Sequence, residues 1–222
     1  MDINMGTLLT KDEEFLFDLH SSTVGAEFAF DDVRNWIISI LNHETDTEAP
    51  DILELLSEWG KASSMLYYLK KLDDREREKI FAANPEDNYE DYLKRQATLE
   101  GFIEGVDKTD TELFESTINK QLMERASAWR ERLKLFKNPE DLDDPSDSFL
   151  DDLMMERDFL EYTLTGVHLV KARHPHFKSI DVNGFTKHVY ETDKTFKQLL
   201  GKRRQLVYWA DSTFWWRHKP EK

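Results

Sequence analysis

The chain has 222 residues, and its 14 Phe, seven Tyr and six Trp exclude a disordered chain, because disordered chains lack such bulky apolar side chains. It has no cysteine, which excludes a disulfide framework, a thiolate nucleophile and a cysteine zinc site. The chain has neither a run of about 18 apolar residues nor a basic-then-apolar N-terminal segment, so we expect a soluble, cytoplasmic protein with no signal peptide and no membrane span.

The formal net charge of -15 is divided unevenly along the chain. Residues 166–222 carry 12 Lys or Arg against five Asp or Glu, so residues 1–165 hold 18 against 40. This asymmetry indicates a partner, or pairing between the two parts of the chain, and does not bear on the fold.

The segment Thr10-Lys11-Asp12-Glu13 has the pattern of a capping box, in which a hydroxyl and a carboxylate pair with open N–H groups at a helix start. It predicts a short helix that runs to about His20, followed by a loop over residues 21–25. A second helix is predicted to begin at Asp31-Asp32, because the helix dipole favours acidic residues there. Its apolar face is Val33, Trp36, Ile37, Ile40 and Leu41.

Pro50 suits the first position of the next helix, since proline lacks only an N–H that is unpaired at that position. The apolar residues that follow are Ile52, Leu53, Leu55, Leu56 and Trp59. Gly60 either closes this helix before residues 63–72 or only weakens one longer helix. Tyr67 and Tyr68 lie outside the apolar stripes and are suited to an interface, because aromatic residues are prominent in binding hot spots.

Three helices are predicted in the middle of the chain. Asp73-Asp74 starts a short helix, and Asn84-Pro85 ends it. Residues 86–106 form a helix of about twenty residues, and a second capping box at residues 109–112 opens the next helix. The apolar face of that helix is Phe114, Ile118, Leu122, Ala126, Trp129, Leu133 and Phe136. The two longer helices are predicted to form an antiparallel hairpin.

Two helices complete the chain. The first covers residues 149–173 and ends before His174-Pro175. The second covers residues 181–218, where apolar or small residues recur at alternating spacings of three and four. This stripe is Val182, Phe185, Val189, Thr192, Phe196, Leu199, Leu206, Ala210 and Phe214, and its only break is Arg203.

The chain contains only eight Gly and six Pro, which favours helices over a sheet with many tight turns. We therefore predict an all-α fold, a helical bundle of about seven or eight helices with a long C-terminal helical hairpin. Residues 1–137 are predicted to form an acidic bundle, residues 138–148 an acidic hinge with two prolines, and residues 149–222 the hairpin. Alternatively, the whole chain is one continuous domain.

The usual marks of catalysis are missing from the sequence. It has no Glu-x-x-His pair for a dimetal bundle, no Gly-x-Ser-x-Gly elbow and no glycine-rich phosphate loop. The paired acids, such as Asp31-Asp32 and Asp73-Asp74, are interpreted as helix-start residues, because neighbouring residues on a helix point about 100° apart. We expect no catalytic residue, no metal ligand and no cofactor.

Basic and aromatic residues gather at the C-terminal end. The candidate partner-binding residues are Lys202, Arg203, Arg204, Tyr208, Trp209, Trp215, Trp216 and Arg217. Cationic side chains beside flat rings suit a protein partner or unpaired bases. Alternatively, the stripe is ordinary helix core and the basic residues pair with the acidic body of the chain.

The sequence predicts a non-catalytic protein–protein interaction subunit, or an acidic inhibitor or immunity-type protein, that binds another macromolecule. Another protein is the expected partner, since a carboxylate-rich surface attracts basic proteins. Two alternatives stay open: a nucleic-acid-binding subunit of a larger complex that uses the basic C-terminal helix, and a helical enzyme with an unrecognised site. No membrane partner is expected, and the sequence gives no oligomeric state.

Overall fold

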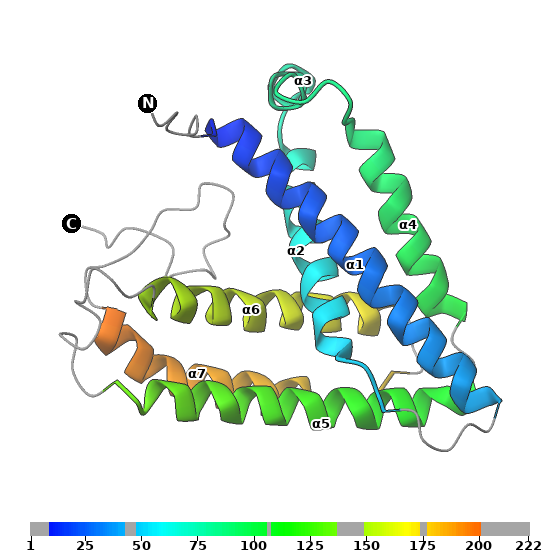
Figure 1. Cartoon of the computed structure of the whole chain (residues 1–222), viewed down its shortest axis with the longest axis vertical. Helices are drawn as coiled ribbons and strands as arrows, with labels where there is room; N and C mark the ends of the chain where they lie inside the picture. Colours follow the sequence, from blue (N-terminus) through cyan, green and yellow to red (C-terminus); the bar gives the residue numbers. More distant parts are fainter. Residues whose placement is uncertain (1–8, 43–47, 106–107, 137–148, 174–176, 201–222) are drawn as a thin grey trace, which may run out of the picture.

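The computed structural model describes residues 9–42, 48–105, 108–136, 149–173 and 177–200. These residues form seven helices, which confirms the predicted all-α helical bundle (Figure 1). The helices are α1 (Lys11–Leu41), α2 (Ile52–Lys71), α3 (Asp74–Phe81), α4 (Tyr89–Gly105), α5 (Lys108–Leu133), α6 (Phe149–Arg173) and α7 (Val182–Leu200). The predicted hinge at residues 138–148 and the end of the predicted C-terminal helix, residues 201–218, lie outside the described residues.

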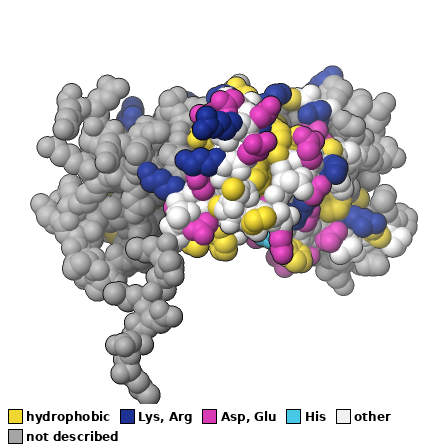
Figure 2. All heavy atoms as spheres, turned by 90° about the horizontal axis from the view of Figure 1, so that it is seen from above, with side chains coloured by type: hydrophobic (Ala, Val, Ile, Leu, Met, Phe, Trp, Pro, Cys, Tyr) yellow, Lys and Arg dark blue, Asp and Glu magenta, His cyan; other side chains and the backbone are white. Residues whose placement is uncertain are grey.

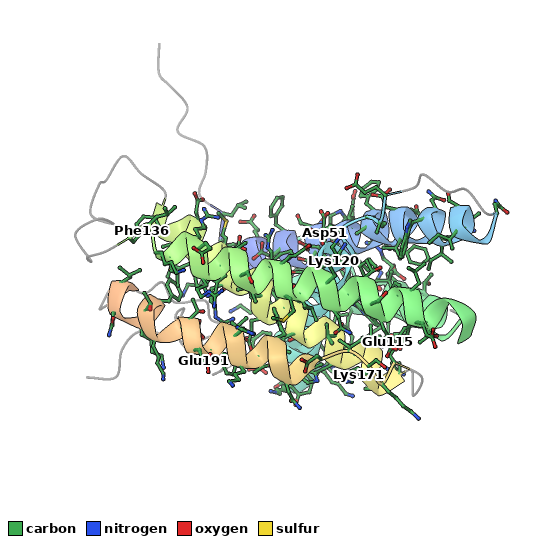
Figure 3. All side chains as sticks on the ribbon, turned by 90° about the horizontal axis from the view of Figure 1, so that it is seen from below. Asp51, Glu115, Lys120, Phe136, Lys171 and Glu191 are labelled. Carbon is green, nitrogen blue, oxygen red and sulfur yellow. The ribbon has the colours of Figure 1, made fainter. Side chains whose placement is uncertain are left out.

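Helix α2 is central to the bundle. It makes its most extensive contacts with α6 and α1, and it also contacts α4 and α5. Figure 1 shows α1 lying across α2, with α5, α6 and α7 running crosswise at one end of these helices. Seen from below, α7 lies alongside α5 (Figure 3).

Two hydrophobic cores lie along α1 and α2. The larger core combines residues of α1, α2, α5, α6 and α7, and within it Trp129 meets Phe196 edge-on with ring centroids 5.1 Å apart. The smaller core combines Phe15 and Leu19 of α1 with Leu69 of α2 and with residues of α3 and α4. Each such buried side chain stabilises the fold by roughly 1.5–3 kcal/mol, so both cores hold α1 against α2.

The predicted capping box at the start of α1 is confirmed. The Glu13 N–H donates to Thr10 Oγ1 at 3.3 Å, and the Thr10 N–H donates to Glu13 Oε2 at 2.7 Å. These reciprocal bonds lower the pKa of Glu13, because the Thr10 backbone N–H stabilises its carboxylate.

The predicted loop at residues 21–25 and the predicted helix start at Asp31-Asp32 are both wrong. Helix α1 is continuous over 31 residues. Thr23 Oγ1 donates to the Leu19 carbonyl oxygen at 2.7 Å inside the helix, and a Cβ added to Gly25 would lie 3.1 Å from Glu58 Cγ of α2. The small residues at positions 21–25 therefore do not form a turn; they let α2 pack close to α1.

The prediction that Pro50 opens α2 is also wrong, by two residues. Asp51 caps the helix by accepting from the Leu53 N–H at 3.0 Å, and Pro50 precedes this cap. The Gln121 side chain of α5 fixes the same corner, since its Nε2 donates to the Pro50 carbonyl oxygen at 2.7 Å and its Oε1 accepts from the Ile52 N–H at 3.0 Å.

Gly60 does not end α2, which continues to Lys71. A Cβ added to Gly60 would overlap the Tyr162 carbonyl oxygen of α6, and a Cβ added to Gly166 would overlap the Leu56 carbonyl oxygen of α2. Ser57 Oγ donates to the Phe159 carbonyl oxygen at 3.3 Å beside this crossing. The two glycines thus let the backbones of α2 and α6 touch, which explains why this helix pair has the most extensive contact.

The predicted start of α3 is confirmed, because Asp73 and Glu76 form a second capping box. The predicted capping box at residues 109–112 is not at a helix start, because α5 begins at Lys108 and Thr109 lies inside it. The predicted hairpin of α4 with α5 is wrong: α4 packs on α1, α2 and α6, whereas α5 packs most extensively on α7.

The predicted apolar face of α5 is confirmed from Phe114 to Leu133, and the described part of the α7 stripe is buried from Phe185 to Leu199. The segment before α7 is held by α5 and α6, near the labelled Glu115 and Lys171 in Figure 3. Glu115 Oε1 accepts from the Ser179 N–H at 2.6 Å, and Lys171 Nζ donates to the Ile180 carbonyl oxygen at 2.9 Å.

Candidate functional site

The eight residues predicted to bind a partner lie outside the described residues. They are Lys202, Arg203, Arg204, Tyr208, Trp209, Trp215, Trp216 and Arg217. That surface therefore stays a prediction, and the candidate surfaces described below come from α1, α2, α4 and α6.

One face of α1 points to solvent along most of the helix. We call it the α1 outer face; it consists of Glu14, Phe17, Ser21, Val24, Phe28, Asp31 and Asn35, which follow one another at spacings of three and four residues. Phe17 is 63% exposed and Phe28 is 70% exposed. At 1.5 Å per residue, their separation of eleven positions places the two residues about 16 Å apart along the helix.

The same helix is strongly acidic. It carries seven Asp or Glu against one Lys and one Arg, and Glu14, Asp31 and Asp32 are exposed beside the two rings. Side chains of both signs are interspersed on the described part of the face seen from above (Figure 2). The α1 outer face therefore combines exposed aromatic rings with negative charge, which suits contact with a basic, partly apolar surface.

The second candidate surface is concave and lies between three helices. We call it the α2–α4–α6 groove, and its volume is about 390 Å³. Its lining includes Leu66 and Tyr67 of α2, Tyr89 and Leu93 of α4, and Leu169 of α6. Tyr67 is 59% exposed, whereas its neighbour Tyr68 is half-buried and its ring contacts that of Phe15 in the smaller core, tilted by 52°.

Gln96 lines this groove and is only 7% exposed. Its Oε1 accepts from Trp59 Nε1 and from Ser63 Oγ, the latter at 3.2 Å. Because the indole N–H can only donate, it fixes which end of the amide faces Trp59. Gln96 Nε2 is consequently a buried donor with no hydrogen-bond partner within the described part of the chain, a condition that costs about 1–3 kcal/mol.

Two charged residues line the groove, Lys70 and Glu100. Glu100 pairs with Arg173 at 2.9 Å. Lys70 is exposed, and no carboxylate of the described residues lies within 4.0 Å of its Nζ. The groove thus has apolar lining residues, a buried amide donor and one cation without an ion-pair partner in the described chain.

A buried ionic cluster joins α6 to α7. Arg157 is 0% exposed and makes two parallel bonds to Asp193, of 2.9 and 3.0 Å, and one of 2.9 Å to Glu161. The nearby Tyr190 has a raised pKa, first because of burial and second because of the Glu161 carboxylate. This cluster joins two helices, and no group of three or more His, Cys, Asp or Glu in the described residues is arranged to hold a metal ion.

The fold is an all-α helical bundle, and the α1 outer face and the α2–α4–α6 groove are two candidate binding surfaces formed by its described residues. Comparison of the chain with protein families, with curated proteins and with solved structures gives no match. None of the helices in the described ranges is both long enough and apolar enough to span a membrane.

Sequence reasoning missed the α1 outer face and Gln96. The spacing of eleven residues, about three helical turns, could have placed Phe17 and Phe28 on one face, but only with α1 continuous through residues 21–25. Nothing in the sequence singles out Gln96, because its environment depends on Trp59, 37 residues away.

Proposed function

We propose that the chain is a non-catalytic interaction subunit or inhibitor that binds a basic protein through the α1 outer face. The observation that carries this proposal is the exposure of Phe17 and Phe28, 63% and 70%, on a helix with seven acidic residues. Large aromatic side chains contribute much of the binding energy at interfaces when a partner covers them.

The two kinds of residue have separate roles in this proposal. The carboxylates of Glu14, Asp31 and Asp32 attract a basic partner and raise the association rate, an effect that salt screens. The rings of Phe17 and Phe28 enter apolar pockets of the partner and slow its dissociation. Packing on α2 along both cores makes α1 rigid before binding, which reduces the ordering cost of the complex.

The experiment starts in the native host. A photo-crosslinking phenylalanine derivative is placed at position 28, and in a matched control at position 135, where Leu135 is 76% exposed. We expect a specific crosslinked protein of high isoelectric point from position 28 alone. If the two positions give the same crosslinks, or position 28 gives none, the proposal fails.

The identified partner is then purified, and its affinity for this chain and for variants of it is measured. We expect the double variant Phe17→Ser, Phe28→Ser to bind at least about tenfold more weakly, a loss of about 1.4 kcal/mol or more, while Leu135→Ser binds as the wild type does. Charge reversal of Lys202, Arg203 and Arg204 tests the C-terminal surface predicted from the sequence in the same assay. Loss of binding in that variant alone would show that the partner binds the C-terminal residues and not the α1 outer face. If the partner is an enzyme, the effect of binding on its activity separates an inhibitor from a subunit.

A further inference from the structure

We propose that the α2–α4–α6 groove is a binding site for a small apolar molecule that carries a carboxylate. This site is separate from the α1 outer face and needs no protein partner. Its volume of about 390 Å³ lies at the lower end of the range of small-molecule pockets, roughly 300–1,000 Å³.

The apolar body of the ligand is recognised by the groove walls. Leu66 of α2, Leu93 of α4 and Leu169 of α6 come from three helices and converge on the same space, with Tyr67 and Tyr89 beside them. Leu93 and Tyr67 are 37% and 59% exposed, so a ligand that covers them removes apolar surface from water.

The oxygen of the ligand is recognised by Gln96. Its Oε1 is already used by Trp59 and Ser63, so the amide can only offer its Nε2 hydrogens, which require an acceptor. Nε2 has almost no solvent-accessible surface in the chain alone, so the ligand oxygen reaches it only when neighbouring side chains of the groove wall move aside; Tyr67 and Leu93 are exposed members of that wall. A hydrogen bond made there then has no competition from solvent. A ligand oxygen that accepts a hydrogen bond from Gln96 Nε2 gives this buried donor the partner that it lacks in the described part of the chain.

The negative charge of the ligand is favoured by Lys70. The other charged residue of the groove, Glu100, is neutralised by Arg173 at 2.9 Å. The groove therefore favours an anion over a cation, and an apolar carboxylate meets the requirements of the walls, of Gln96 and of Lys70 together.

Binding is tested on the full-length purified chain with decanoate, decan-1-ol and decylammonium, each below its aggregation concentration. We expect one decanoate to bind per chain, the ammonium compound to bind at least about tenfold more weakly, and the alcohol to lie between them. The side-chain NH₂ resonances of Gln96 should move during the decanoate titration, whereas those of Gln121, whose Nε2 already donates to Pro50, should not.

Two surface variants locate the site without disturbing the core. Leu93→Gln should weaken decanoate binding about tenfold or more, while the matched Leu113→Gln, on α5 with a similar exposure of 39%, should not. Lys70→Glu should weaken it several-fold, while Lys120→Glu on α5 should not.

Three outcomes would overturn the proposal. The first is an absence of decanoate binding up to about 1 mM, and the second is equal binding of decanoate and decylammonium. The third is an equal response of Leu93→Gln and Leu113→Gln. None of these outcomes bears on the proposal that α1 binds a protein partner. Likewise, failure of the crosslinking experiment would not contradict the proposed carboxylate site in the α2–α4–α6 groove.

Discussion

The Arg157 guanidinium lies inside the protein between α6 and α7, where it pairs with Asp193 and Glu161, which are also buried. Arg157→Met removes the cation and leaves two buried carboxylates with less compensation, so we expect the free energy of unfolding to fall by about 3–5 kcal/mol. Urea denaturation followed by circular dichroism measures this. Arg130→Met is the control, because the Arg130 side chain is 50% exposed and an exposed ion pair contributes about 0–1 kcal/mol. Equal effects of the two variants would contradict this account of the cluster.

Glu58 is a second residue whose burial has a measurable consequence. Burial raises the pKa of its carboxyl, against the lowering effects of Ser22 and Lys61. The native chain therefore holds this proton more tightly than the unfolded chain does. As pH rises through the ordinary Glu pKa of about 4.3 and then through the higher native value, stability is lost.

We therefore expect Glu58→Gln to be more stable than the wild type at pH 7, with a difference that shrinks as pH falls towards 4. Urea denaturation at several pH values measures the difference, and Glu54→Gln, at an exposed position on the same helix, should show a smaller pH dependence. A difference that is constant with pH, or that grows on acidification, would rule out burial as the dominant influence on Glu58.

At the scale of elements, the contact of α2 with α6 depends on having no side chain at Gly60. Gly60→Ala places a methyl group against the Tyr162 carbonyl oxygen, so we expect it to lower the free energy of unfolding by about 1–3 kcal/mol or more. Gly101 of α4 is the matched control, because nothing lies within 4 Å of a Cβ added there. Gly101→Ala should raise stability by about 0.5–1 kcal/mol through helix propensity. Thermal denaturation of the two variants should give shifts of opposite sign, and shifts of the same sign would contradict the close crossing.

These elements also indicate what the sequence could and could not predict. The buried faces of α5 and α7 were predictable, because a helix packed on one side along its length repeats apolar residues at its own period. The continuity of α1 was not, since Ser22, Thr23 and Gly25 normally favour a turn and here allow α2 to come close. Gly60 was ambiguous for the same reason. Whether a glycine marks a turn or a close contact depends on the helix that packs against it. The sequence around the glycine describes only its own helix.

At the scale of the whole molecule, the larger core crosses the predicted boundary at residues 138–148. Leu56 and Trp59 of α2 share it with Leu160 and Val167 of α6 and with Phe196 of α7. The most extensive helix contact, α2 with α6, likewise joins residues from the two sides of that segment. This arrangement favours the alternative of one continuous domain.

We therefore expect a chain that ends at residue 148 to lose its fold, because it exposes the α2 face that α6 covers and leaves Trp129 without Phe196. Its far-ultraviolet circular dichroism should be reduced and its urea transition should be broad. Residues 1–143 and 144–222, expressed together as two chains, provide the matched control. The two pieces share the larger core, so they should associate without a covalent link, co-purify and unfold together in one cooperative transition. If residues 1–148 alone give a sharp transition with native helix content, the acidic bundle is a domain in its own right, and the α2–α6 crossing is an interface between two domains.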